Sequence, residues 1–149
     1  MKIAIGCDHG GINLKPTVVD AINELGYSIV DFGTHGSGSV DYPDFAYKVA
    51  KAVVSGEADK GVLICGTGIG ISIAANKVRG IRCAHITDVF SAEMSAAHNN
   101  ANIIALGGRI TTPETAREIV NKFFTTEFEG GRHSKRVDKI TQIETQENL

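Results

Sequence analysis

A cysteine followed by three closely spaced glycines is the part of this sequence best suited to chemistry. Cys65 comes directly after the apolar run 62–64, and Gly66, Gly68 and Gly70 follow at alternate positions. The glycines allow a tight turn whose backbone N–H groups converge on one small volume. A helix predicted to follow would add its positive end to the same volume. The stretch therefore predicts an anion-binding turn beside a thiol.

The thiol itself has two interpretations. A helix N-terminus stabilises a thiolate, which makes Cys65 a candidate base or nucleophile. A cysteine at the end of a strand can instead be a small buried hydrophobic residue. The three glycines favour the first interpretation.

Further polar residues stand where other predicted elements end. Asp8 and His9 follow the strand predicted at residues 3–6, and His98 and Asn99 close a predicted helix. The carboxyl ends of parallel strands meet at one edge of a sheet, where ligands bind. Two alternatives stay open: Asp8 as the cap of the next helix, and His98 as a residue that only favours the negative helix end.

Three arginines are candidates for binding phosphate. Arg109 follows a glycine pair beyond the last predicted strand, and Arg132 and Arg136 lie one helical turn apart. The planar guanidinium suits bidentate phosphate binding, although a solvated basic face is the alternative. Arg132 and Arg136 can complete a site only by folding back or by reaching across a dimer interface.

Several site classes are absent from the sequence. A dinucleotide fingerprint would need a third glycine where Ile71 stands, so small phosphorylated substrates are favoured over NAD or FAD. No HExxH or CxxC motif or clustered ligand spacing is present, and we predict no metal. A serine-hydrolase elbow is also missing.

A thiol, an oxyanion-type turn, a histidine and arginines form a consistent chemistry that needs no cofactor. It is proton abstraction next to a carbonyl, with stabilisation of an enediolate. Two other classes stay open: a non-catalytic regulator that binds sugar phosphates, and a nucleotide-binding protein.

Composition limits the setting of this chemistry. At 149 residues, the chain is expected to form one domain over residues 1–149. Its net charge of -2 gives no general attraction to nucleic acid or to anionic membranes. Three cysteines without paired spacing predict free thiols in a reducing compartment, simplest the cytoplasm, with Cys7 and Cys83 in the core.

Alternating strands and helices must position the candidate residues. Strands are predicted at 3–6, 27–32, 62–64, 82–86 and 103–106, and helices at 12–25, 45–54, from 71 onward, 89–97, 113–124 and 134–146. The first helix accommodates Pro16 if it effectively begins near Lys15. We therefore predict a doubly wound α/β fold, a Rossmann-like three-layer sandwich with a five-stranded parallel sheet and a C-terminal helix.

Five segments carry a resemblance to a known family. They read IGCDHGG, DYPDFA, ICGTGIGISIAANKVRGIRCA, HNNANIIALGGR and EGGRHSKR, and together they are specific where each alone is weak. Over nearly its whole length the chain resembles ribose-5-phosphate isomerase type B, in the family that also holds the galactose-6-phosphate isomerase subunits.

The resemblance implies interconversion of ribose 5-phosphate and ribulose 5-phosphate, in the pentose phosphate pathway and without a cofactor. It implies Cys65 as the base and His98 as the acid that opens the furanose ring. Thr67 and Asp8 would assist at sugar hydroxyls. The substrate ligands implied are the turn residues Gly66, Thr67, Gly68, Ile69 and Gly70, then Asn99, and for the phosphate His9, Arg109, Arg132 and Arg136.

The resemblance also implies a homodimer or a dimer of dimers, with the site shared between subunits. Galactose-6-phosphate isomerase divides its chemistry between unlike subunits, whereas this chain carries both halves. That favours the ribose enzyme, with allose 6-phosphate or galactose 6-phosphate as alternative substrates. Asn100 stands where many relatives have an aspartate, next to the two matched residues His98 and Asn99.

Overall fold

A computed structural model describes residues 1–148. Five strands form one parallel sheet in the order β2-β1-β3-β5-β4. Their bounds are β1 Lys2–Cys7, β2 Ser28–Asp31, β3 Lys60–Cys65, β4 Cys83–His85 and β5 Ile103–Gly107. The predicted five-stranded parallel sheet is confirmed.

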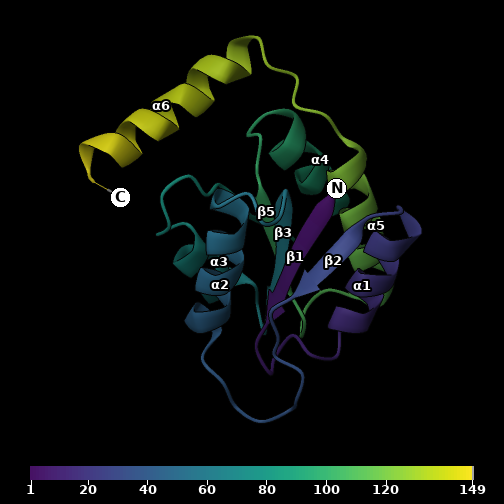
Figure 1. Cartoon of the computed structure of the whole chain (residues 1–149). Coiled ribbons are helices and arrows are strands. Elements are labelled where there is room, and N and C mark those ends of the chain that lie inside the picture. Colours follow the sequence, from purple (N-terminus) through teal and green to yellow (C-terminus); the bar gives the residue numbers. More distant parts are fainter. Residues whose placement is uncertain (149) are drawn as a thin grey trace.

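Helices cover both faces of this sheet. They are α1 Lys15–Glu24, α2 Tyr42–Val54, α3 Ile69–Ala75, α4 Val89–Ala97, α5 Pro113–Thr125 and α6 Arg132–Gln146. Helices α2 and α3 lie on one side, and α1, α4 and α5 on the other (Figure 1). The arrangement is the predicted three-layer doubly wound fold.

The sheet separates two hydrophobic cores because its central strands are apolar on both faces. Ile3, Ile5, Ile64 and Leu106 pack beneath α1, α4 and α5. Leu63 packs with the other core beneath α2 and α3. Burial on both sides is expected of a parallel strand covered by two helical layers.

Several element boundaries differ from the sequence prediction. Helix α1 begins at Lys15, as the position of Pro16 predicted, and not at residue 12 where the apolar period starts. Pro43 likewise allows α2 to start at Tyr42, three residues before the predicted start. Helix α6 begins two residues early, at Arg132, and β4 is limited to Cys83–His85. In contrast, α5 starts as predicted, with the Thr112 hydroxyl accepting from the Thr115 N–H.

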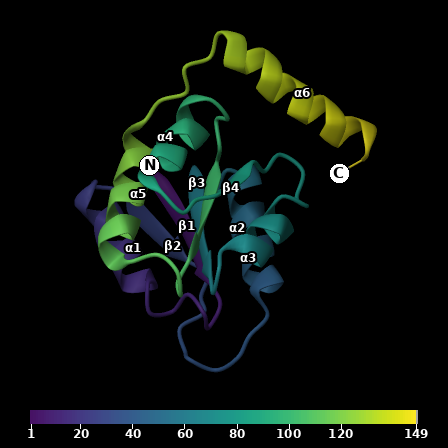
Figure 2. The ribbon, with the colours of Figure 1, turned by 180° about the vertical axis from the view of Figure 1, so that it is seen from behind.

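Helix α6 projects from the end of the sheet where the strands begin, as both views show (Figures 1 and 2). The Glu144 carboxylate accepts a hydrogen bond from the Gly80 N–H at 2.8 Å. On α6, Val137 is buried, whereas Ile140 and Ile143 are 46% and 57% exposed. Across residues 1–148, no helix combines the length and apolarity needed to cross a membrane.

Candidate active site

The edge where β1 and β3 end has the geometry of a binding crevice. The helix after β1 packs on one face of the sheet, and the helix after β3 packs on the other. Loops that leave neighbouring strands in opposite directions open a crevice between them. Asp8 and Cys65 lie at this point, one residue beyond β1 and at the end of β3.

Cys65 sits inside the glycine turn with its sulfur facing a backbone donor. The Gly68 N–H donates to Cys65 Sγ at 3.1 Å, and the residue is 5% exposed. The thiolate is the form of cysteine that takes up a proton. Gly68 has φ +82°, and an added Cβ would lie 2.9 Å from the carbonyl carbon of Leu106. The turn therefore requires glycine at this position.

The loop after β5 closes over this turn and brings Arg109 to it. The Gly108 N–H donates to the Cys65 carbonyl at 2.7 Å, and the Arg109 N–H to the Gly66 carbonyl at 3.0 Å. The Arg109 guanidinium also lies beside Gly66, where an added Cβ would be 3.1 Å from Nη1. The structure thus places a predicted phosphate ligand beside the predicted base.

Asp8 and His9 lie in a neighbouring turn. The Asp8 N–H donates to the Ile64 carbonyl at 3.1 Å, and its carboxylate accepts from the Gly10 N–H at 2.8 Å. The alternative of Asp8 as a helix cap is wrong, because α1 starts at Lys15 and its N-cap Leu14 makes no side-chain cap. His9 Nδ1 accepts from the Val40 N–H at 3.2 Å, which ties the loop before α2 to the site.

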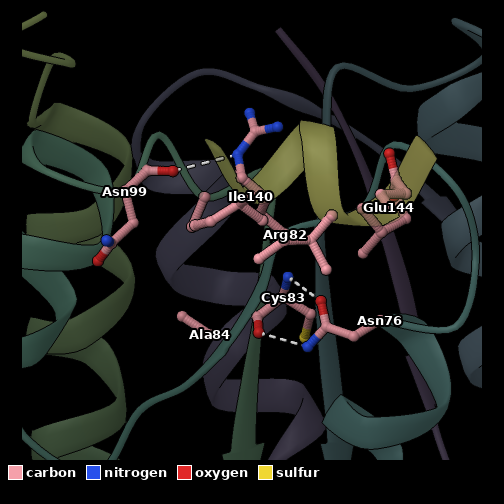
Figure 3. Close-up of a pocket in the computed structure, with 10 residues that line it drawn as sticks. Asn76, Arg82, Cys83, Ala84, Asn99, Ile140 and Glu144 are labelled. Atoms are coloured by element: carbon pink, nitrogen blue, oxygen red, sulfur yellow. Dashed lines mark hydrogen bonds between the residues drawn. The ribbon is translucent and has the colours of Figure 1, made fainter. Parts of the chain in front are cut away.

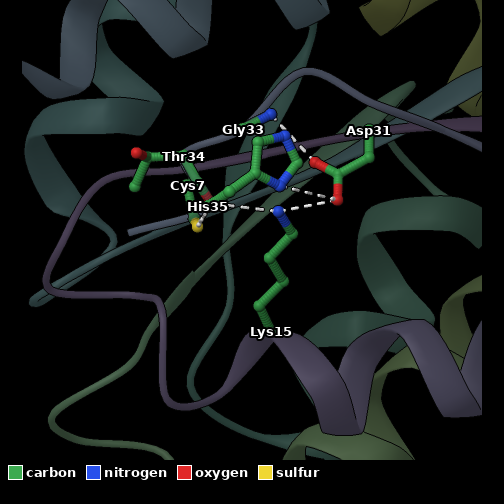
Figure 4. A network of polar contacts seen from close by, with 6 residues as sticks. All are labelled: Cys7, Lys15, Asp31, Gly33, Thr34 and His35. Carbon is green, nitrogen blue, oxygen red and sulfur yellow. Dashed lines mark hydrogen bonds and ion pairs between the residues drawn. The ribbon is translucent and has the colours of Figure 1, made fainter. Parts of the chain in front are cut away.

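A polar network fixes the start of that loop (Figure 4). Lys15 Nζ lies 2.7 Å from the Asp31 carboxylate and donates to the Thr34 carbonyl at 3.1 Å. Asp31 also accepts from the Gly33 N–H. Cys7 is buried beside this network, and burial raises the pKa of its thiol more than nearby Lys15 lowers it. The prediction that Cys7 belongs to the core is confirmed.

Two side chains of this edge were missed by the sequence reasoning. Tyr42 lies over Gly70, where an added Cβ would come within 2.6 Å of the ring carbon Cζ. His85 Nε2 is 2.8 Å from the Thr67 carbonyl, so the end of β4 supports the turn. Tyr42 stood in the quoted segment DYPDFA, whereas His85 had no signal beyond its place at the end of a strand.

The remaining turn residues face outward. Thr67 Oγ1 accepts from the Ile69 N–H at 3.2 Å, and Ile69 is 50% exposed. Thr67 is therefore held within the turn through both its hydroxyl and its carbonyl.

His98 and Asn99 lie at the opposite edge of the sheet. His98 is the C-cap of α4, which runs back from the edge that holds Cys65. The chain then enters β5, where Ile103 pairs with Gly61 at one end and Gly107 with Cys65 at the other. Four residue steps along a strand span about 13 Å. One chain therefore does not bring His98 to Cys65.

Arg132 and Arg136 share the distant edge, since both lie on α6. The sequence suggested that they could fold back to the site or reach it across a dimer. The structure contradicts folding back, because α6 lies at the end of the sheet where the strands begin, opposite the end of β3 that holds Cys65 (Figure 1). The predicted residues thus form two groups within one chain.

His98 belongs to a cluster of three ionisable side chains, with Glu129 and His133 as its neighbours. His98 Nε2 is 3.5 Å from the Glu129 carboxylate, and its ring stacks on His133 at 3.9 Å between centroids. Burial, and then the neighbouring charge of His98, lowers the pKa of His133 below its ordinary value of 6.5. Linear spacing gave no sign of this cluster, because its members come from α4, a loop and α6.

The spacing of this cluster would allow a metal ion, but its stacked rings do not suit one. Ligand atoms of His98, Glu129 and His133 lie within 4.8 Å of one another. That limit includes the roughly 3.4 Å between tetrahedral ligand atoms of zinc bound at 2.0–2.2 Å. The two imidazoles lie in nearly parallel planes with centroids 3.9 Å apart, so their in-plane lone pairs do not converge on one point. The expectation of no metal stays a prediction.

A groove of about 410 Å³ lies beneath α6 at this same edge (Figure 3). Arg82 crosses it and donates from Nε to the carbonyl of Asn99 at 3.1 Å. Ile140 lines the groove, as does Cys83, whose thiol has its pKa raised by burial to about 12. The predicted core position of Cys83 is therefore only partly correct, since it borders a cavity.

Comparison with known proteins identifies the family. A family model described as Ribose/Galactose Isomerase matches residues 3–140. The chain belongs to the ribose/galactose isomerase family. Within this family it is 48% identical to ribose-5-phosphate isomerase B of Escherichia coli, over 99% of both chains. It is 44% identical to D-erythrulose-4-phosphate isomerase of Pectobacterium atrosepticum, over 99% of this chain and 97% of that one.

A solved member of the family has the same fold. The ribose-5-phosphate isomerase B of Clostridium thermocellum is 57% identical and superimposes with a TM-score of 0.96, over 98% of this chain and 99% of that one. The resemblance and the fold class predicted from the sequence are confirmed. The protein is an enzyme, a sugar-phosphate isomerase.

Proposed function

We propose that this isomerase interconverts ribose 5-phosphate and ribulose 5-phosphate. Cys65 would take a proton from C2 of the open-chain aldose and return one to C1, through an enediolate. A positioned general base typically contributes about 10²- to 10⁴-fold to the rate. Proton transfer of this kind needs no cofactor.

The observation that carries this proposal is the Gly68 N–H at 3.1 Å from Cys65 Sγ. This contact sets one N–H of the turn against the thiol at the β1–β3 crevice. N–H groups of residues 66–70 would hold the developing enediolate, and such a donor can be worth roughly 3–4 kcal/mol. Arg109 and His9 lie at the same edge and would bind the phosphate.

A second copy of the chain would complete the site. We assign ring opening to His98 and further substrate contacts to Asn99, Arg132 and Arg136, all at the distant edge of their own chain. A homodimer, alone or paired into a dimer of dimers, can bring one copy's distant edge to the other's crevice. Exposed apolar side chains support such contact: Ile69, Ile73, Phe90 and Ile110 are 50–70% exposed.

A four-carbon substrate is the second candidate. The 44% identical relative from Pectobacterium atrosepticum is named for D-erythrulose 4-phosphate. The chemistry at Cys65 would be the same, because the shorter sugar also carries a carbonyl next to an exchangeable proton. Allose 6-phosphate and galactose 6-phosphate remain longer alternatives.

Turnover of a substrate panel by purified, chelator-treated protein tests the proposal. We expect ribose 5-phosphate to give the highest kcat/KM against erythrulose 4-phosphate, allose 6-phosphate and galactose 6-phosphate. Cys65→Ala should lower kcat about 10²- to 10⁴-fold while calorimetry still detects sugar-phosphate binding. Near-normal turnover in that variant would contradict the assigned base. Binding without turnover in the unmodified protein would instead favour a regulator.

A further inference from the structure

The imidazole of His98 lies flat against the imidazole of His133. The ring centroids are 3.9 Å apart, and the ring planes differ by 12°. His133 is 8% exposed, so its own ring is fixed by the surrounding protein. A ring stacked on a fixed surface cannot tilt without losing that contact.

Glu129 lies against the edge of the same imidazole. Its carboxylate is 3.5 Å from His98 Nε2. Its own N–H donates to the Ala97 carbonyl at 2.9 Å, so the residue is tied to the position directly before His98. One face and one edge of the His98 ring therefore have defined neighbours.

Cations surround this pair from two further segments. Arg132 and Arg136 on α6 lie near enough to His133 to disfavour its protonation, and Glu129 acts in the opposite direction. Arg82 binds the carbonyls of the two residues after His98, Asn99 and Asn100. Glu129 thus supplies a negative charge where the other charged neighbours are positive.

We propose that Glu129 and His133 are positioning residues for His98, which hold its imidazole in the orientation needed to meet the ring oxygen of a bound sugar phosphate. The proposal rests on the proposed function for the role of His98. Neither residue touches the substrate in this assignment. They act by contacting the face and the edge of the His98 imidazole.

Loss of positioning should separate kcat from KM. The guanidinium groups of Arg132 and Arg136 would still bind phosphate, so KM should change little. Displacement of the His98 imidazole should lower kcat far more, since a misplacement of about 1 Å lowers rates by about 10²-fold. The expected signature is a lower kcat at nearly constant KM.

Paired variants of the full-length protein test this at each contact. We expect His133→Ala and Glu129→Ala to lower kcat for ribose 5-phosphate about 10- to 100-fold. His133→Phe keeps a flat ring, and Glu129→Gln keeps a side-chain oxygen. Both variants should therefore retain most of the wild-type kcat. Glu127→Ala is the matched control, because it truncates the same type of side chain at an exposed site two residues away.

Nuclear magnetic resonance gives a readout that does not depend on turnover. The His98 ring protons should be shifted upfield by the stacked ring of His133. The shift should vanish in His133→Ala and persist in His133→Phe. If the unmodified protein turned over no sugar phosphate, the proposed function would fail while this measurement still tested the stack.

Two results would overturn the proposal. His98 resonances that stay in place in His133→Ala would show that no stack orients the ring. Equal losses of kcat in His133→Ala and His133→Phe would show that a flat neighbour is not what His98 requires.

Discussion

The turn at Cys65 and the cluster at His98 differ in how their own chain supports them. Cys65 is 5% exposed and is enclosed by backbone hydrogen bonds from the Gly68 and Gly108 N–H groups. The His98 side chain is 34% exposed, and its partner Glu129 is 52% exposed. The first region is enclosed by one chain, whereas the second lies open under a projecting helix.

This difference fits the proposal that two copies of the chain complete the site together. Backbone bonds between neighbouring parallel strands fix the turn as soon as the sheet forms. The cluster around His98 has no such frame, and the apolar side chains Ile140 and Ile143 near it stay exposed on α6. A second copy that covers this edge would supply the missing surface and join the two groups of residues.

Subunit complementation tests most strongly whether the Cys65 turn and the His98 cluster act together across two subunits. Cys65→Ala and His98→Gln should each lose about 10²-fold or more of the turnover. Refolded together in equal amounts, they should recover about a quarter of wild-type activity, because half the dimers are mixed and one of their two sites is intact. The measurement is turnover of ribose 5-phosphate before and after mixing.

A second mixture serves as the control. Cys65→Ala combined with Asp8→Asn places both changes at the same edge, so no mixed dimer regains an intact site. No recovery in the first mixture would mean that the residues of the site act within a single chain. Recovery in the second mixture as large as in the first would contradict the assignment of Cys65 and Asp8 to the same edge of one chain.

Local sequence signals were sufficient to predict the fold and the turn. Continuous apolar runs predicted β3 and β5, and three glycines after Cys65 predicted the turn that faces its sulfur. Both depend on residues close in sequence, where the period of apolar residues and the need for positive φ are directly visible. Proline positions explain where α1 and α2 begin, but not the early starts of α3 and α6.

The cluster at the distant edge could not be predicted in the same way. His98, Glu129 and His133 meet only because α4 runs back across the sheet and a loop then returns to it. The spacing of these three residues in the sequence does not predict that their side chains come into contact. Tyr42 was missed for a similar reason, because its contact with Gly70 depends on how α2 packs against α3.

Gly68→Ala should lower kcat less than the Cys65 and His98 substitutions, and it should also destabilise the turn. Its φ of +82° and the carbonyl carbon of Leu106 at 2.9 Å leave no room for a Cβ. We expect a loss of about 1–3 kcal/mol in the free energy of unfolding. The Gly68 N–H should also move from Cys65, lowering kcat about 10-fold. Urea unfolding and turnover assays measure the two effects.

Gly26→Ala is the matched control for backbone strain. Gly26 also has φ +82°, but an added Cβ would meet nothing within 4 Å, and the position lies after α1, away from the site. It should lose stability while keeping its kcat. If both variants kept full turnover, the Gly68 donor would have no part in the chemistry of Cys65.

The smallest expected effect is a pH dependence of stability at the open edge. Burial and the charge of His98 lower the pKa of His133 in the folded chain below its ordinary 6.5. The unfolded chain therefore binds more protons than the folded chain as the pH falls below 6.5, and His133 then opposes folding. Above 6.5 both states hold it neutral, and the effect is absent.

His133→Phe isolates this contribution because it keeps a flat ring without a titrating group. Between pH 7.5 and 5.5, the thermal midpoint of the wild type should fall further than that of His133→Phe. Hydrogen bonds from Ser91 lower the pKa of Asp88 below 3.8, so that carboxylate loses its stabilising effect only at more acidic pH and does not confuse the comparison. Parallel midpoints for the two proteins would show that His133 titrates alike in the folded and unfolded chains. Protonation of His133 would then not lower the stability of the fold.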